Sequence, residues 1–244
     1  MKISSRILFA IAALALAALA CQALTGGGQE SPPVDVSVPT VDLPEPTVEI
    51  IPPIFGGSDV LLNDDFSSSR WGTGTDADSS VEYANEALQF IVFTDNYFVW
   101  STPDAEDYSN VHLEVTALNN STDPDAAFGV ICNMQITNVS YYFAVNANGQ
   151  YAIGKSSLAL DDVFLTNNDQ WGDSSLIPQN ASSYRVGADC GSDGTLTLYV
   201  NGQQIDSATD TDYTSGNVAL FTWSGKEPAG ADVSFDDFEL KELP

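Results

Sequence analysis

Residues Leu196-Thr-Leu-Tyr-Val-Asn-Gly202, with Ser215-Gly-Asn-Val-Ala-Leu220 after them, contain the strongest fold signal in the sequence. The first stretch alternates in the way that a strand with one buried face does. It ends in Asn201-Gly202, a pair that readily adopts the positive φ angles of a tight hairpin turn. A second such pair stands at Asn148-Gly149. These features predict antiparallel strands joined by short turns.

The same pattern continues from Val60 to the end of the chain. Short runs of alternating apolar and polar residues are separated by Gly, Asn and Asp, and almost no helical periodicity is present. About a dozen strands are the number found in a two-sheet sandwich. We therefore predict an all-β, two-sheet antiparallel domain over residues 60–244. The predicted strands are Glu82–Tyr83, Ala87–Phe93, Phe98–Ser101, Val111–Ala117, Ala127–Met134, Tyr141–Asn146, Gln150–Lys155, Ser183–Asp189, Leu196–Val200, Gln203–Ala208, Asn217–Thr222 and Val233–Lys241.

Composition excludes several classes of function. The 244 residues include 7 Lys+Arg and 34 Asp+Glu, for a net charge of -27. Such a charge repels nucleic acid, so we expect no nucleic-acid partner. The one histidine, His112, excludes a multi-histidine metal site, and any Ser-His-Asp unit would have to use its ring. His112 alternates with Glu114 on the wet face of its strand, so we expect a surface residue.

The N-terminus reads as an export signal. Lys2 and Arg6 precede an apolar run that ends at Ala20, directly before Cys21. The run with its cysteine resembles the lipobox of bacterial lipoproteins. This resemblance implies a signal peptide over residues 1–20, acylation of Cys21, and a lipid anchor that holds the protein on the extracytoplasmic face of a membrane.

An uncleaved membrane helix from Ile7 to Leu24 is the alternative interpretation of this segment. Residues 21–59 are rich in Pro, Gly and acidic residues, which predicts a disordered, extended linker. Its apolar Pro-containing patches leave open a motif for another protein.

Alternation also orients the two remaining cysteines. Phe128, Val130, Cys132 and Met134 share one face of their strand, and Cys190 shares a face with apolar residues of the strand that begins near Tyr184. Both thiols therefore point inward. In an exported protein this predicts a disulfide between Cys132 and Cys190. A pair of buried free thiols is the alternative.

Asp-Asp-Phe occurs at both ends of the domain, in Asn63-Asp-Asp-Phe66 and in Phe235-Asp-Asp-Phe238. The repetition predicts that the first and last strands lie close together, with these phenylalanines on the core. Taken with the Phe128-Gly-Val-Ile-Cys strand and the opening stretches, the motifs resemble the concanavalin A-like jelly rolls. Within that group they resemble laminin G-like and 3-keto-disaccharide hydrolase-like domains of bacterial secreted proteins.

The resemblance covers roughly residues 61 to 242 and implies a jelly-roll fold, but its motifs are structural. Many catalytic relatives are retaining glycosidases with a Glu-x-Asp-x-Glu strand, and this sequence has none. Asp236 and Asp237 are adjacent, so they point to opposite faces. A sugar hydrolase of the keto-disaccharide type therefore rests on analogy alone.

The resemblance also implies a structural calcium ion that ties the terminal strands. Asp65 and Asp237 are the expected carboxylate ligands, since calcium prefers hard oxygen donors. Hydrogen bonding in turns and at strand ends is the alternative for these residues.

Sugar recognition needs a flat aromatic face rimmed by amides and hydroxyls. Trp171 and Trp223 stand in polar, loop-like surroundings, and Tyr142 shares a strand face with Asn146. Asn133 and Gln135 share a face on another strand, and if these two faces coincide, they line the concave sheet. The alternative is that the aromatic residues, Trp71, Trp100 and Tyr151 among them, pack in the core.

These observations favour a non-catalytic, lipid-anchored protein whose jelly-roll module binds a glycan or cell-surface polymer. A sugar-active hydrolase and a structural or protein-interaction module are the alternatives.

Overall fold

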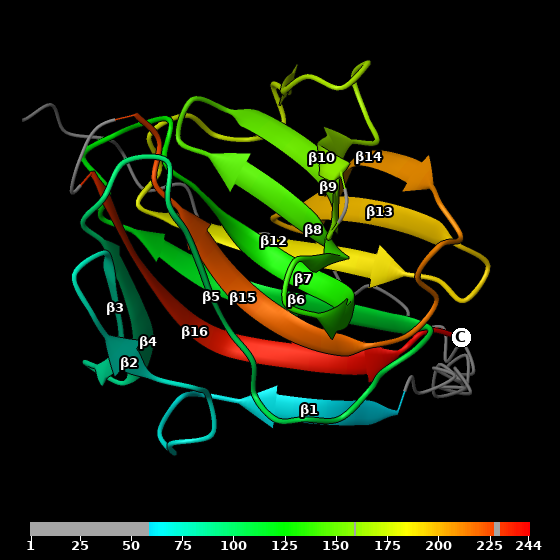
Figure 1. The fold of residues 1–244 in the computed structure, drawn as a ribbon, viewed down its shortest axis with the longest axis horizontal. Coiled ribbons are helices and arrows are strands. Elements are labelled where there is room, and N and C mark those ends of the chain that lie inside the picture. Colours follow the sequence, from blue (N-terminus) through cyan, green and yellow to red (C-terminus); the bar gives the residue numbers. More distant parts are fainter. Residues whose placement is uncertain (1–58, 159, 227–229) are drawn as a thin grey trace, which may run out of the picture. The chain divides into compact units, whose positions relative to one another are not determined.

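The computed structural model describes residues 59–158, 160–226 and 230–244. Within these ranges the chain is all β (Figure 1), which confirms the predicted fold class. No helix in them has the length and apolar character needed to cross a membrane. The signal peptide expected over residues 1–20, Cys21 and the linker up to residue 58 lie outside the described residues.

The strands form two antiparallel sheets. One has nine strands in the order β14-β13-β12-β6-β16-β4-β3-β2, with β1 paired to β16, and the other has seven in the order β10-β9-β8-β7-β15-β5, with β11 paired to β9. The strand bounds are β1 Val60–Asp64, β2 Gly74–Thr75, β3 Ser79–Ala84, β4 Ala87–Val92, β5 Phe98–Ser101, β6 Val111–Asn119, β7 Ala127–Ile136, β8 Val139–Asn146, β9 Gln150–Ser157, β10 Leu160–Phe164, β11 Gly172–Asp173, β12 Ser183–Cys190, β13 Thr195–Val200, β14 Gln203–Thr209, β15 Asn217–Trp223 and β16 Ala231–Glu242.

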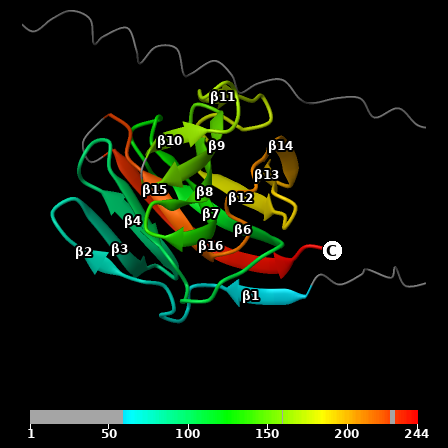
Figure 2. The same cartoon turned by 45° about the vertical axis from the view of Figure 1, so that its right-hand side comes forward.

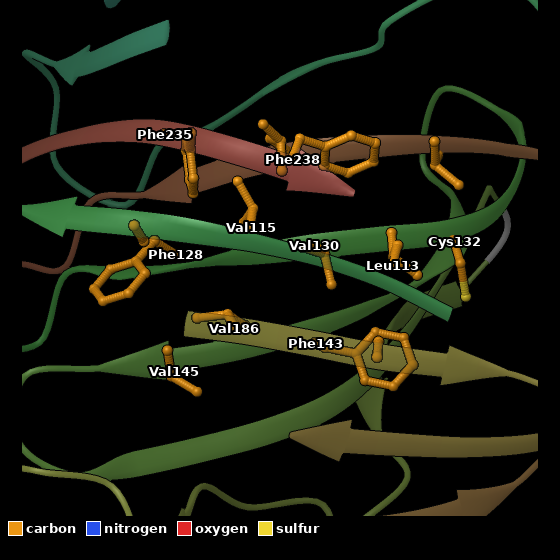
Figure 3. Packing of buried hydrophobic residues seen from close by; sticks show 14 of the residues in the cluster. Leu113, Val115, Phe128, Val130, Cys132, Phe143, Val145, Val186, Phe235 and Phe238 are labelled. Carbon is orange, nitrogen blue, oxygen red and sulfur yellow. The ribbon is translucent and has the colours of Figure 1, made fainter. Parts of the chain in front are cut away.

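The core lies between the inner faces of the two sheets (Figure 3). Alternate residues of β6, β12 and β16 meet alternate residues of β7 and β8, because successive side chains of a strand point to opposite faces. The buried side chains include Leu113, Val115, Val186, Phe235, Phe128, Val130, Phe143 and Val145.

A disulfide crosses this core from β7 to β12. Cys132 and Cys190 are bonded, with their Cα atoms 6.6 Å apart and a sequence separation of 58. The predicted pairing is confirmed, and the bond joins the two sheets.

The terminal strands lie side by side, as the repeated Asp-Asp-Phe motif predicts. β1 pairs with β16, with Asp64 opposite Phe238, and the two strands run together in both views (Figures 1 and 2). Phe66, Phe235 and Phe238 are all buried. The carboxylate of Asp64 accepts hydrogen bonds from the backbone N–H of Phe66 at 2.8 Å and from Nε1 of Trp71 at 3.2 Å.

Both predicted hairpins are present, between β8 and β9 and between β13 and β14. Gly149, Asn201 and Gly202 have φ angles of 83°, 51° and 75°, the left-handed values that such turns require. Four strands, β1, β2, β10 and β11, lie outside the predicted list, although the repeated Asp-Asp-Phe motif predicted a first strand beside the last one. β10 shows why, because Leu160-Asp-Asp-Val-Phe164 is almost entirely exposed and has no apolar alternation.

Candidate functional site

A groove of about 420 Å³ lies on the outer face of the seven-stranded sheet. This volume is within the range of small-molecule binding sites. The groove contacts every strand of the path from β10 to β5, five steps of about 4.8 Å, so it extends for roughly 24 Å across the strands. It is therefore long enough for an extended ligand.

Aromatic side chains form the walls of the groove. Those on β5, β8 and β15 project away from the core because they occupy strand positions that alternate with residues of the main core cluster. These residues come from strands across the whole sheet, from both edges to the centre. They are Phe98 and Trp100 of β5, Tyr142 of β8, Phe164 of β10, Phe221 and Trp223 of β15, and Trp171 directly before β11.

The rings make an almost continuous row. Phe98 stacks on Phe221, with ring centroids 4.8 Å apart and planes at 19°. Tyr142 meets Phe221 edge-on at 6.0 Å and Phe164 edge-on at 6.4 Å. Phe164 in turn meets Trp171 at 5.4 Å. Mutual packing of this kind holds the ring planes in fixed orientations before any ligand arrives.

Small residues at the base of the groove leave space above them. Ala127 and Ala144 line it directly. Gly154 stands opposite Tyr142 in the β8–β9 pair, and a Cβ atom at residue 154 would lie 2.1 Å from Cζ of Tyr142. The phenol ring of Tyr142 therefore lies flat over a position that only glycine can occupy without displacing it.

The hydroxyl of Tyr142 can donate a hydrogen bond to a ligand. The residue is 8% exposed, and within the described part of the chain its hydroxyl has no hydrogen-bond partner. Burial raises the pKa of Tyr142, and the charges of Asp162 and Asp169 raise it further. The hydroxyl stays protonated at neutral pH and is available to a ligand oxygen.

One end of the groove is polar. Ser140 and Ser156 face each other across β8 and β9, and the hydroxyl of Ser156 donates to the carboxylate of Asp162 at 3.0 Å. Burial raises the pKa of Asp162, and the charge of Asp161 adds to this, against the Ser156 hydrogen bond. Asp162 is the one carboxylate, and there is no lysine, arginine or histidine, among the described residues that line the groove.

Three of the six residues predicted to bind ligand meet in this groove: Tyr142, Trp171 and Trp223. Asn146 lies elsewhere, at the start of the β8–β9 turn, where it is 2% exposed. Its Oδ1 accepts hydrogen bonds from the backbone N–H groups of Asn148 and Gln150, both at 3.1 Å. Asn146 therefore shapes the hairpin.

A β-bulge removes Asn133 and Gln135 from the groove. Asn133 has a φ of 50°, and the β7–β8 register shifts between Cys132 and Ile136. The Asn133 side chain turns inward and donates to the carbonyl of Tyr213 at 2.8 Å, while Gln135 donates to the carbonyl of Ser215. The expectation that Met134 faces inward with Cys132 is wrong for the same reason, since Met134 lines the groove.

The two residues expected to bind calcium have hydrogen-bonding roles. Asp65 accepts from the backbone N–H of Ser67 at 3.1 Å. Asp237 has a φ of 50° at a bulge in β16, and its carbonyl accepts from the guanidinium of Arg185. No cluster of three or more His, Cys, Asp or Glu residues suited to a metal ion occurs in the described ranges. The calcium site stays a prediction.

The other aromatic candidates divide between core and groove. Trp71 is buried at 3% exposure between Phe66 and Phe238, with centroid distances of 5.6 and 5.0 Å. Tyr151 is also buried, and its hydroxyl donates to Asp206 at 2.9 Å. Trp100 lines the groove. Phe98, Phe164 and Phe221 were not predicted. The alternation of β5 and β15 was a usable signal for Phe98 and Phe221, whereas β10 has no alternation that would indicate Phe164.

No family model and no curated protein matches this sequence. Solved structures do match its fold. A carbohydrate-binding module, CBM66 of Bacillus subtilis, is 14% identical and has a TM-score of 0.56, with 71% of this chain and 96% of that one covered. A Bacillus subtilis protein of unknown function with a galectin-like fold is 11% identical and has a TM-score of 0.54, with 75% of this chain and 96% of that one covered.

The Bacillus licheniformis β-glucanase gives 10% identity and a TM-score of 0.53, over 75% of this chain and 98% of that one. At these identities the likeness shows the fold alone. The described domain has the two-sheet jelly-roll fold that the sequence motifs predict.

Proposed function

We propose that the groove binds a neutral glycan and does not cleave it. The row of aromatic rings across the seven-stranded sheet carries this proposal, because the apolar faces of sugar rings stack on such surfaces. The Tyr142 hydroxyl and the serine hydroxyls at the polar end supply hydrogen bonds to ligand hydroxyls. The carbohydrate-binding module and the β-glucanase with this fold are consistent with a glycan-related function.

The charge distribution favours a ligand without acidic groups. Asp162 supplies a negative charge inside the groove, no basic side chain lines it in the described chain, and the whole protein carries a net charge of -27. An anionic sugar would therefore be repelled. Binding of a neutral ligand should change little with ionic strength.

Hydrolysis is the weaker alternative. A retaining glycosidase needs two carboxyl groups about 5 Å apart. Among the described residues that line the groove, Asp162 is the one carboxylic acid, and its hydrogen bond to Ser156 fixes it at the polar end. A structural or protein-interaction module is the other alternative, and it would leave the aromatic row without a sugar ligand.

A glycan array on the full chain with Cys21→Ser, followed by calorimetry, tests the proposal. Trp171→Ala and Trp223→Ala should each weaken binding by about tenfold or more, equivalent to about 1.4 kcal/mol. Tyr142→Phe should weaken it less, because only one hydrogen bond is lost. Phe93→Ala removes an exposed ring outside the groove and is the control. Parental affinity in all three groove variants, while they stay folded, would overturn the proposal.

We also propose that the protein is anchored by an acylated Cys21 on the extracytoplasmic face of a membrane. The signal-like sequence before Cys21 and its resemblance to a lipobox support this placement. A glycan-binding domain at that location would meet cell-surface polymers.

A further inference from the structure

A second hollow of about 440 Å³ lies next to the groove. It is formed between β5, which ends the seven-stranded sheet, and β2, which ends the nine-stranded sheet. Phe98 and Trp100 line both spaces. The groove runs across the strands toward β5, so the hollow continues the same path beyond the edge of the sheet.

Among the described strands, β5 pairs with β15 on one edge and has no partner strand on the other. The carbonyl of Tyr97 accepts from the backbone N–H of Ser224 at 3.0 Å on the β15 side, and the carbonyl of Thr102 accepts from Gly72 at 3.2 Å on the other side. Antiparallel pairing alternates along a strand. The backbone N–H and C=O groups of Phe98 and Trp100 therefore face the hollow.

Besides Phe98 and Trp100, Val81, Tyr97 and Val99 add apolar surface to the hollow, and the other lining residues are small or polar. Residues 72–75 contribute two glycines and two threonines, and Ser79 and Thr102 add further hydroxyl groups. The hydroxyl of Thr75 already donates to Glu82 at 2.8 Å, so its oxygen is held in place. Asp76 is the one charged residue of the described lining, and its carboxylate accepts from the N–H groups of Asp78 and Ser79, both at 2.9 Å. Such a surface suits a polyol better than an apolar or anionic group.

We infer that this hollow is a second subsite for the same ligand, which is therefore a neutral oligosaccharide chain that crosses Phe98 and Trp100 and extends beyond the sheet. The inference rests on the proposed function of the groove. Sugar hydroxyls in the hollow hydrogen-bond to the backbone groups of β5 that no strand of the described residues pairs with. The two shared aromatic residues connect the subsites, so the chain passes through without turning away from the surface.

Gly74 offers a clean way to block the hollow. It lies in β2 among the lining residues, and a Cβ atom added there would have no atom within 4 Å. Gly74→Leu should therefore fill open space and leave the fold intact. Ser207→Leu is the matched control, because Ser207 is an exposed residue of β14 at the opposite edge of the same sheet.

The experiment measures affinity by calorimetry for neutral oligosaccharide series from disaccharide to octasaccharide, built from β-glucan, α-glucan, mannan and xylan. We expect affinity to rise with chain length for the parent. Gly74→Leu should lower the affinity for long chains by about tenfold, leave that for short chains unchanged, and thereby flatten the length dependence. Ser207→Leu should bind like the parent throughout.

Two failures can be told apart. Length-independent binding, or equal binding of long chains by Gly74→Leu and the parent, would overturn the second subsite while leaving the groove as a glycan site. No binding in any series, or groove variants Trp171→Ala and Trp223→Ala that bind like the parent, would overturn the proposed function and the second subsite together.

Discussion

Nδ1 of His112 lies 2.6 Å from Oδ1 of Asp189, across the neighbouring strands β6 and β12. The other oxygen of Asp189 accepts from the hydroxyl of Tyr199 at 2.7 Å, and Nε2 of His112 lies 3.8 Å from Glu114. Glu114 also pairs with Arg185 at 3.0 Å. His112 thus lies on the outer face of the nine-stranded sheet, as expected, but its side chain is only 26% exposed because it belongs to a polar network.

Stability should fall as pH rises above neutrality. Burial alone would lower the pKa of His112, but its hydrogen bond to Asp189 and the nearby carboxylate of Glu114 outweigh this and raise the pKa to about 9, against 6.5 ordinarily. The stabilisation is therefore complete below about pH 6.5 and is lost as pH rises through about 9. After allowance for partial exposure, the loss should be on the order of 1–3 kcal/mol.

Denaturant unfolding at several pH values measures this loss. His112→Gln should be less stable at pH 6 and should show a flatter profile between pH 6.5 and 9. Charged groups that face the ring are Asp189, Glu114 and Lys241, which stands opposite His112 in β16. A parental profile with no decline in this range would contradict the raised pKa.

Removal of the disulfide should destabilise the domain by roughly 2–5 kcal/mol. The bond between Cys132 and Cys190 closes a long loop and joins the two sheets, so its loss frees the unfolded chain. The comparison is between Cys21→Ser alone and Cys21→Ser with Cys132→Ala and Cys190→Ala. In the first protein, thiol titration after denaturation without reductant should find no free thiol.

Gly154→Ala should impair both stability and ligand binding. The added methyl group would lie 2.1 Å from Cζ of Tyr142, so the phenol ring must leave the floor of the groove. We expect a loss of about 1–3 kcal/mol from overpacking and a weaker affinity for glycan. Gly74→Ala, where a Cβ atom has no neighbour within 4 Å, should fold like the parent. Unchanged binding by Gly154→Ala would show that the position of Tyr142 does not matter.

Acylation of Cys21 is expected from its place directly after Ala20. An alkyne fatty acid should label the parent and should fail to label Cys21→Ser, which should leave the membrane fraction. An unlabelled parent would favour the uncleaved helix over residues 7–24.

Calcium bound by Asp65 and Asp237 should raise the melting temperature. At a calcium concentration 100 times the dissociation constant, the free energy of unfolding should increase by about 2.7 kcal/mol. Chelator should reverse the effect, and Asp237→Asn should abolish it. Because the Asp237 carbonyl already accepts from Arg185, the carboxylates would have to supply the binding. Identical melting curves with calcium and with chelator would remove the site.

Alternation in the sequence predicted most of the fold, because the two-residue period of a strand does not depend on its partners. It oriented Cys132 and Cys190 correctly. It failed at Asn133, whose left-handed conformation is accompanied by a hydrogen bond to the carbonyl of Tyr213, 80 residues away. No local pattern contains that contact.

The candidate site was predicted only in part for a related reason. Alternation separates the two faces of a strand but does not say which face is inner when both carry apolar residues. In β15 the run Val218-Ala-Leu-Phe-Thr-Trp223 alternates between core and groove. The pairing of Tyr142 with Gly154 depends on the register of β8 and β9, which the turn at Gly149 sets. The sequence of the turn does not indicate that this pair lies in a binding groove.

The bond between Cys132 and Cys190 also matters mechanically. A ligand bound in the groove, as proposed, would pull on the seven-stranded sheet, whereas β1, near the start of the described residues, belongs to the nine-stranded sheet. Tension between them must cross from one layer to the other. Noncovalent packing resists such separation by many weak contacts, and the sulfur bridge between β7 and β12 adds a link that does not yield until a covalent bond breaks. Under flow or traction, the two layers of this domain would move as one body.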